Sequence, residues 1–222
     1  MNKKIIATGD KSKTLLIPEL NETYHSSNGA LNEALHVFRD AGLNYFTNNK
    51  PLSVFEMGFG TGLNALVSLD YANTHAIKIN YTTIENTPID IALIDELAYT
   101  NLFTGTNLKS DYRKLHLEPW NNSVRINKNF EFEKILGKIQ EYIPNDHQKF
   151  DLIFYDAFGP RVQPELWTDT IMQQMYKMLN EGGILITYCA QGQFKRNLKS
   201  AGFTVENLPG PIGKREITRG IK

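Results

Sequence analysis

The sequence predicts a single α/β domain built on a mostly parallel sheet. From Pro51 onward, short apolar runs alternate with helical stretches, which is the pattern of successive βαβ units. Residues 150–156 form a nearly continuous apolar run flanked by acids, as expected of a strand that is buried on both faces of a parallel sheet. A chain of 222 residues that is 41% hydrophobic can fill one such core, which excludes a disordered protein.

The first 50 residues predict a small N-terminal extension that packs on a catalytic domain of residues 51–222. Two short apolar runs, at 5–8 and 14–17, flank a polar turn and indicate a β-hairpin. A helix over 30–41 follows, because apolar side chains recur on one helical face.

The catalytic domain should continue as strands and helices in alternation. Residues 100–122 show little periodicity and are expected to form a loop with short helical turns, and the last two strands should pair antiparallel around a Pro-Gly-Pro turn. The expected strands are 52–57, 77–85, 124–126, 150–156, 184–188, 203–208 and 215–218, and the expected helices are 63–69, 88–97, 132–143, 165–179 and 194–201.

Composition excludes several classes of protein. Cys189 is the single cysteine, so an internal disulfide is impossible and a reducing compartment is indicated. The five histidines lie far apart, without metal-ligand spacing, so no metal site is expected. No signal peptide and no apolar run of membrane-spanning length is present, which predicts a cytoplasmic protein with no membrane partner.

A glycine-rich loop follows the first strand of the predicted parallel sheet. Gly58-Phe59-Gly60-Thr61-Gly62 separates this strand from a helix, and Glu56 stands just before it. Glycine allows a ligand to approach the backbone, and the helix N-terminus offers free N–H groups. The G-x-G-x-G spacing disfavours a nicotinamide dehydrogenase, which uses G-x-G-x-x-G. The pattern instead resembles the first motif of class I S-adenosylmethionine-dependent methyltransferases, in which the loop wraps the methionine part of the cofactor and the preceding acid helps orient it.

Two further acids end strands of the same sheet. Glu85 lies 23 positions after Gly62, near the roughly 20-residue offset at which an acid binds ribose hydroxyls in such folds. Asp156 should project into the same crevice, because parallel sheets bind ligands outside the carboxyl ends of their strands. A carboxylate there can hold an attacking amine and accept its proton. The alternatives are a solvated strand-end charge for Glu85 and a turn or capping acid for Asp156.

Three motifs together resemble the methyltransferase domain of the MnmC family, the bifunctional enzymes of tRNA 5-methylaminomethyl-2-thiouridine synthesis. They are residues 55–64, residues 155–160 with Trp167 downstream, and residues 213–216. The resemblance implies a Rossmann-like class I methyltransferase fold, a mostly parallel seven-stranded sheet with an antiparallel C-terminal strand, and S-adenosylmethionine as cofactor. It also implies that Asp156 is the active-site aspartate and that the exocyclic amine of 5-aminomethyl-2-thiouridine, at the tRNA wobble position U34, is methylated.

The candidate site residues fall into two groups. Those expected to bind the cofactor are Glu56, Gly58, Phe59, Gly60, Thr61, Gly62, Asn64, Glu85, His25 and Ser26. Those expected to contact the tRNA anticodon loop are Tyr24, Phe158 and Pro160, beside the base, and Lys195, Arg196, Lys214 and Arg215, which suit phosphates. Helix capping is the alternative for Ser26, and a solvated surface is the alternative for each basic residue.

The charges balance overall but not locally. The 24 basic and 24 acidic residues sum to zero, which is unlike a general nucleic-acid binder. Residues 195–222, however, hold seven basic residues against Glu206 and Glu216. This basic end predicts tRNA binding that weakens steeply with salt.

Two departures from the family pattern affect the expected site. Gly137-Lys138 stands where the family often has Gly-Asp, so a backbone group is expected to replace that acid at the adenine. Asp156-Ala157-Phe158 replaces the family's Asp-Gly-Phe, which exchanges one small residue for another.

The bifunctional members also carry an FAD-dependent oxidase domain. Since the chain ends at Lys222, a stand-alone methyltransferase is expected, and a separate FAD-dependent oxidase acting upstream stays open as a partner. The alternatives to a tRNA enzyme are a small-molecule N-methyltransferase, an aminopropyltransferase and a non-catalytic S-adenosylmethionine-binding module.

Overall fold

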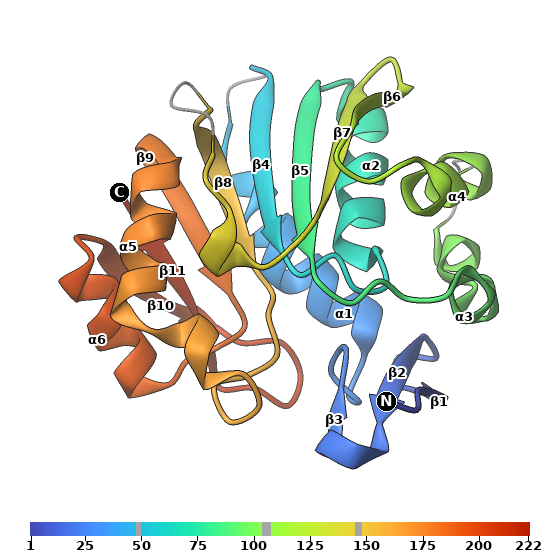
Figure 1. Cartoon of the computed structure of the whole chain (residues 1–222), viewed down its shortest axis with the longest axis horizontal. Helices are drawn as coiled ribbons and strands as arrows, with labels where there is room; N and C mark the ends of the chain where they lie inside the picture. Colours follow the sequence, from blue (N-terminus) through green and yellow to red (C-terminus); the bar gives the residue numbers. More distant parts are fainter. Residues whose placement is uncertain (48–49, 104–107, 145–147) are drawn as a thin grey trace.

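The computed structural model describes residues 1–47, 50–103, 108–144 and 148–222, and in these it shows an eight-stranded sheet between two layers of helices (Figure 1). The α/β fold class is therefore confirmed. From one edge to the other, the strands are β10 (Thr204–Pro209), β11 (Glu216–Ile221), β9 (Leu179–Thr187), β8 (Phe150–Tyr155), β4 (Leu52–Met57), β5 (Ile79–Glu85), β7 (Phe130–Leu136) and β6 (Ser123–Asn127).

The centre of the sheet is parallel. Strands β7, β5, β4, β8 and β9 run in one direction, whereas β6, at one edge, and β11 run antiparallel to their neighbours β7 and β9. The expected antiparallel C-terminal pair is present, with β10 beside β11. Because β4 and β8 are neighbours in register, the backbone N–H of Asp156 donates to the Met57 carbonyl at 3.1 Å. The loop after β4 therefore lies beside the end of β8.

The helices divide the hydrophobic core into two parts, one on each face of the sheet. The first part packs α1 (Ala30–Ala34), α2 (Leu63–His75), α3 (Ile91–Leu97) and α4 (Lys109–Leu117) against one face. The second packs α5 (Asp169–Met178) and α6 (Gly192–Ser200) against the other. Short helical turns lie at Pro18–Leu20, Leu43–Tyr45, Tyr99–Leu102, Ile139–Glu141 and Pro164–Trp167.

The N-terminal extension contains the predicted hairpin and helix. Strands β1 (Lys4–Ala7) and β2 (Lys13–Ile17) pair antiparallel, and the two-residue strand β3 (Glu22–Thr23) adds to β2. Helix α1 continues directly into a π-helical segment, Leu35–Asp40, so the predicted helix over 30–41 is present with a wider final part. The small sheet lies beyond one end of the main sheet (Figure 1), where it can contribute to a site.

The predicted helix over 132–143 is wrong. Residues 130–136 form β7, and β6 pairs with it antiparallel. Phe130, Phe132 and Lys134 are buried while the residues between them are partly exposed, which is the two-residue period of a strand. Lys134 hides this period in the sequence, because a lysine is not expected at a buried position. Its ammonium group donates to the His116 carbonyl and lies 4.7 Å from the centroid of the Trp120 ring.

Three smaller expectations also need correction. Helix α3 begins at Ile91, where the Asp90 side chain accepts from the Ala92 N–H at 2.8 Å, so Pro88 precedes the helix. Part of the expected loop at 100–122 forms the nine-residue helix α4. The sheet has eight strands rather than the predicted seven, because β7 forms where a helix over 132–143 was predicted.

Candidate active site

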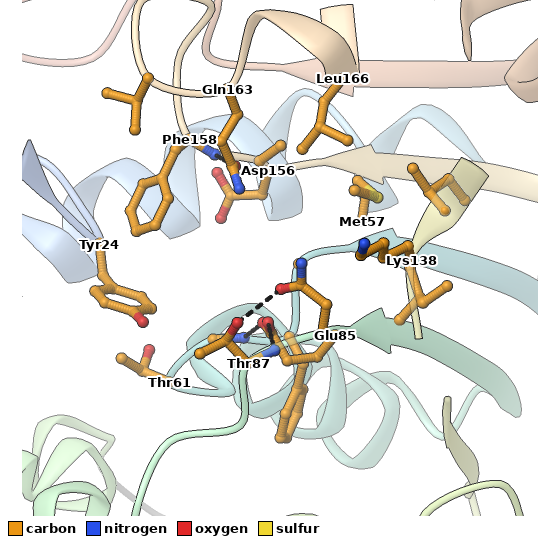
Figure 2. Close-up of a pocket in the computed structure, with 18 of the residues that line it drawn as sticks. Tyr24, Met57, Thr61, Glu85, Thr87, Lys138, Asp156, Phe158, Gln163 and Leu166 are labelled. Atoms are coloured by element: carbon orange, nitrogen blue, oxygen red, sulfur yellow. Dashed lines mark hydrogen bonds between the residues drawn. The ribbon is translucent and has the colours of Figure 1, made fainter. Parts of the chain in front are cut away.

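A cavity of about 520 Å³ opens at the carboxyl ends of β4, β5 and β8 (Figure 2). The loop after β4 forms its floor, and the N-terminal extension contributes Tyr24 and His25 to its wall. Of the predicted site residues, the cavity brings together Tyr24, His25, Gly58, Phe59, Gly60, Thr61, Asn64, Glu85, Asp156 and Phe158.

The glycines of the loop are required by its shape. Gly58, Gly60 and Gly62 all have positive φ angles, of 92°, 50° and 71°. A Cβ on Gly62 would lie 2.8 Å from His116 Nε2, and one on Gly60 would lie 3.2 Å from the Tyr24 ring. Gly62 therefore allows close packing beneath the loop, and Gly60 allows Tyr24 to lie over it.

The Glu85 carboxylate is anchored at the end of β5. Its Oε2 accepts from the Gly60 N–H at 3.0 Å and its Oε1 accepts from the Thr87 N–H at 2.8 Å (Figure 2). Burial raises the pKa of Glu85, and these backbone N–H groups act against that rise. The carboxylate thus lies at the cavity wall with its position defined, and it retains lone pairs for a ligand hydroxyl.

Glu56 lies behind the loop rather than in the cavity. It is fully buried and outside the cavity lining, and within the described residues neither carboxyl oxygen has a hydrogen-bond partner. Thr83, Asn64 and Tyr81 lie close enough to lower its pKa, but burial outweighs them and raises the pKa well above its usual value. Glu56 is therefore a buried acid whose protonated form is favoured, and it lies outside the cavity in which it was expected to bind the cofactor.

We expect Glu56→Gln to keep cofactor binding and to stabilise the fold at neutral pH. Folding raises the pKa of Glu56, so the folded state binds its proton more tightly than the unfolded state does. The free energy of unfolding therefore falls as pH rises above the pKa of the unfolded-state carboxyl. Glutamine does not titrate, so the Glu56→Gln variant avoids this loss. Its thermal unfolding midpoint should lie above that of the wild type, and the difference should be larger at pH 8 than at pH 4.5. Loss of S-adenosylmethionine binding at both pH values would instead show that an ionised Glu56 serves the cofactor.

Asp156 lies at the opposite wall, at the end of β8. Its Oδ2 accepts from Asn64 Nδ2 at 2.7 Å. Burial, followed by the nearby Glu33 carboxylate, raises the pKa of Asp156 to about 7, while the Asn64 hydrogen bond and the Lys214 ammonium act in the opposite direction. An acid that titrates near neutrality, at the wall of a cavity, is suited to proton transfer.

One end of the cavity forms an apolar slot. Met57, Ile84, Ile139 and Leu166 line it, together with Gly137 and the polar residues Lys138 and Gln140. The Gly137 N–H donates to the Glu85 carbonyl at 3.0 Å, which places the segment beside the end of β5. The sequence located this segment through Lys138 but missed the apolar residues, whose only local signal is that they end or follow strands.

Aromatic residues border the other end. The Tyr24 and Phe158 rings make an edge-to-face contact with centroids 5.1 Å apart. Gln163 completes this wall, and its Oε1 accepts from the Phe158 N–H at 3.2 Å. Pro160 lies outside the cavity lining, so it does not shape the wall as expected.

Of the two N-terminal residues expected to bind the cofactor, His25 lines the cavity and Ser26 does not. His25 lines the cavity, and its ring lies 3.3 Å from Thr14 Oγ1 and 3.4 Å from Thr61 Oγ1. Burial lowers the pKa of His25 to about 4, so the ring is neutral at pH 7. Ser26 lies outside the lining, and its Oγ accepts from the Asn28 N–H at 3.2 Å, which fits a turn-capping role.

The basic residues expected to bind phosphate also differ in their surroundings. Lys195 pairs with Glu216 at 2.6 Å and Lys214 pairs with Glu33 at 2.5 Å. Arg196 and Arg215 are exposed, and neither has a carboxylate partner in the part of the chain that the structure describes. Of these four basic residues, two are thus neutralised by a carboxylate and two are not.

The described residues offer neither a metal site nor a membrane-spanning helix. They contain no group of three or more His, Cys, Asp or Glu side chains that could hold a metal ion. None of their helices is long and apolar enough to cross a membrane.

Comparison with known proteins identifies the family. The family described as S-adenosyl-L-methionine-dependent methyltransferase matches residues 106–222, more than half of the chain. The chain belongs to this family. The crystal structure of MnmC2 from Aquifex aeolicus superposes on the methyltransferase with a TM-score of 0.76 and 25% identity, covering 99% of this chain and 70% of that one. The resemblance to MnmC methyltransferase domains is therefore confirmed.

Sequence relatives of the methyltransferase extend over most of its length. An uncharacterised protein of Methanocaldococcus jannaschii, MJ0670, is 26% identical over 98% of the chain. The tRNA 5-methylaminomethyl-2-thiouridine biosynthesis bifunctional protein MnmC of Burkholderia mallei is 28% identical over 93% of the chain. The methyltransferase spans 59% of the first protein and 34% of the second.

Proposed function

We propose that this methyltransferase transfers a methyl group from S-adenosylmethionine to the exocyclic amine of 5-aminomethyl-2-thiouridine at the tRNA wobble position, U34. The observation that carries the proposal is the Asp156 carboxyl, which has a pKa of about 7 and faces the same cavity as the glycine loop. The names of the MnmC relatives supply the substrate class.

The cavity suits the cofactor in three respects. The backbone of Gly58 to Thr61 can approach the methionine part, the Glu85 carboxylate can accept from ribose hydroxyls, and the slot of Met57, Ile84, Ile139 and Leu166 can hold the adenine. A volume of about 520 Å³ lies within the usual range for ligand sites. S-adenosylmethionine, when bound, supplies an electrophilic methyl group on a positively charged sulfur.

Asp156 would act on the attacking amine. The amine needs a free lone pair, so the carboxylate accepts a proton from the ammonium form and holds the neutral nitrogen. The nitrogen lone pair then forms the new C–N bond while the carbon–sulfur bond breaks with its electron pair onto sulfur. A proton leaves the methylated nitrogen or stays on it as an ammonium ion, and Asp156 returns its own proton to solvent.

The aromatic wall suits an extruded base. Tyr24 and Phe158 border the cavity on the side of Asp156, and a flipped uridine requires aromatic or apolar surface to replace its stacking. Unstacking costs little in an anticodon loop, because its bases are already unpaired.

Methyl incorporation from labelled S-adenosylmethionine tests the substrate. Transfer RNA from cells that lack the wobble methyl group should accept label at U34, and fully modified tRNA should not. Absence of incorporation by a folded protein that binds S-adenosylmethionine, or efficient methylation of small amines alone, would contradict the tRNA proposal.

Removal of Arg196 and Arg215, the two predicted phosphate-binding residues without a carboxylate partner among the described residues, should weaken tRNA binding. It should also reduce the dependence of this binding on salt. Arg196→Ala combined with Arg215→Ala deletes two exposed charges from the basic C-terminal region, and each lost phosphate contact should reduce the slope of log K against log salt by roughly 0.7. Filter binding at several salt concentrations measures the slope. Arg125→Ala, on the distant strand β6, is the matched control, and equal slopes for all three proteins would place the tRNA elsewhere.

A further inference from the structure

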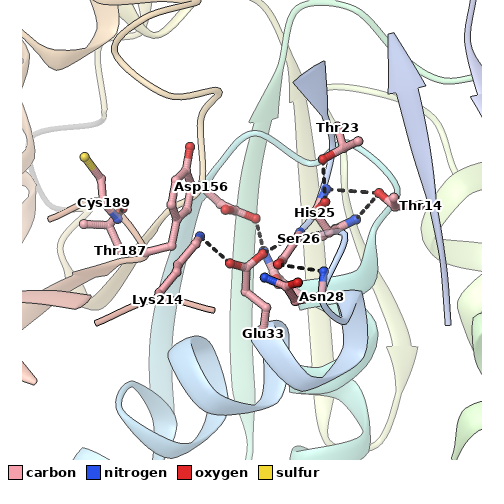
Figure 3. A network of polar contacts seen from close by, with 12 residues as sticks. Thr14, Thr23, His25, Ser26, Asn28, Glu33, Asp156, Thr187, Cys189 and Lys214 are labelled. Carbon is pink, nitrogen blue, oxygen red and sulfur yellow. Dashed lines mark hydrogen bonds and ion pairs between the residues drawn. The ribbon is translucent and has the colours of Figure 1, made fainter. Parts of the chain in front are cut away.

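A partly buried ion pair lies beside Asp156 and joins segments that are far apart in the sequence (Figure 3). Lys214 Nζ, in the turn between β10 and β11, lies 2.5 Å from Glu33 Oε1 on α1. The side chains are 30% and 10% exposed, so water screens this pair less than it screens a surface pair.

Both charges are held in place by neighbouring groups. Glu33 Oε2 accepts from the Ser26 N–H at 2.8 Å, and Lys214 Nζ lies 4.0 Å from the centroid of the Tyr188 ring. The Tyr188 hydroxyl in turn donates to the carbonyl of Ala157, next to Asp156, at 2.8 Å. The pair is thus connected to the backbone that carries Asp156.

The two charges act on the Asp156 carboxyl in opposite directions. The Glu33 carboxylate disfavours its ionised form and the Lys214 ammonium favours it. The other polar or titratable groups that act on Asp156, or on which it acts, are Asn64 from α2, Glu56 from β4, Tyr81 from β5 and Tyr188 at the end of β9. Among the groups named, Lys214 carries the single positive charge, and Glu33 already binds it.

We propose that Glu33 and Lys214 are positioning residues for the proposed methyl transfer, in which Glu33 holds Lys214 near Asp156 while preventing a direct ion pair between them. A lysine paired directly with Asp156 would lower the pKa of the carboxyl by about 1–3 units and make it a weak base at pH 7. Without the lysine, only the Asn64 hydrogen bond would oppose the effects of burial and Glu33, so the protonated form of the carboxyl would be favoured further. The shared lysine keeps Asp156 between these extremes. This inference rests on the proposed function, in which Asp156 accepts the proton of the amine.

Single and double substitutions distinguish this role from a structural one. The value of kcat/KM should rise with pH as Asp156 ionises. The substrate amine also ionises, but its contribution to the profile is the same for every variant and does not affect the comparison. Glu33→Gln should move the midpoint of this rise to lower pH and Lys214→Met should move it to higher pH, each by about one unit. The double variant should return close to the wild type.

A matched control removes a similar pair that does not act on Asp156. Arg219 pairs with Glu206 at 2.7 Å between β11 and β10, so Glu206→Gln should leave the midpoint unchanged. Affinity for S-adenosylmethionine, measured by calorimetry, should also stay unchanged in the Glu33 and Lys214 variants. If Lys214→Met does not fold, Lys214→Gln provides the same charge deletion.

The outcomes separate this inference from the proposed function. Equal losses at every pH without a shift of the midpoint, or shifts in the same direction, would overturn the positioning role. If Asp156→Asn keeps the rise with the wild-type midpoint, Asp156 is not the titrating group and the proposed mechanism itself fails. Carbon-13 NMR of labelled aspartate carboxyls gives the Asp156 pKa directly, without turnover.

Discussion

Replacement of Asp156 by asparagine will reduce turnover by roughly 10²–10⁴-fold, the usual contribution of a positioned acid or base. Asparagine has nearly the same shape, and its Oδ1 can still accept the hydrogen bond from Asn64 Nδ2 that Asp156 accepts at 2.7 Å. It cannot take a proton from the amine, so S-adenosylmethionine affinity should be retained while kcat falls. Single-turnover methyl transfer and calorimetric binding measure the two quantities.

The pH profile provides the second part of this test. Since the pKa of Asp156 is raised to about 7, the wild-type rate should increase as pH rises through 7 and should level off when the carboxyl is ionised. The asparagine variant should lack the part of this rise that Asp156 contributes, so only the ionisation of the substrate amine should remain. Asp40→Asn, an exposed site outside the cavity lining, is the control, and full activity of Asp156→Asn would remove the carboxyl from the mechanism.

Replacement of Glu85 by glutamine should weaken S-adenosylmethionine binding by about 10–100-fold. Glu85 accepts backbone N–H bonds through both oxygens, and the amide NH₂ of glutamine would face one of these donors. Loss of a hydrogen bond to a charged group costs about 1.5–3 kcal/mol, and each 1.4 kcal/mol corresponds to about tenfold in affinity. Titration calorimetry of the purified variant measures the change.

The matched control for Glu85 is Glu141→Gln. Glu141 is exposed at the end of the turn Ile139–Glu141, next to the cavity but outside its lining. The control should bind S-adenosylmethionine as the wild type does, and both variants should unfold near the wild-type temperature. Wild-type affinity in a folded Glu85→Gln protein would show that the ribose is held by other groups.

Local sequence patterns predicted most of the parallel core. The strands that became β4, β5, β8 and β9, the glycine loop, and the acids at the strand ends follow from apolar runs and short-range spacing. The helix predicted over 132–143 failed because Ile135 and Ile139 fit a helical period by chance. The alternation of Phe130, Phe132 and Lys134 was the correct signal, and a buried lysine concealed it.

The charged residues near the C-terminus form more ion pairs than their composition suggested. Seven basic residues between 195 and 222 suggested a broad cationic end. Four of them instead form ion pairs, with Glu216, Glu33, Glu206 and Glu181. Fewer exposed basic side chains are therefore left to contact phosphates in the proposed tRNA complex, and Arg196 and Arg215 are two of them.

The sequence by itself determined the fold class, the family, and the glycine loop with Glu85 and Asp156 around it, because each is carried by short local patterns: apolar runs, a glycine spacing, and acids at the ends of strands. Only the tertiary structure decided that Glu56 lies behind the loop and that Glu33 meets Lys214 beside Asp156. Burial and long-range charge pairs depend on which surfaces pack together. Local spacing in the sequence cannot predict that Glu33, on the first helix, contacts Lys214, which lies 181 positions later.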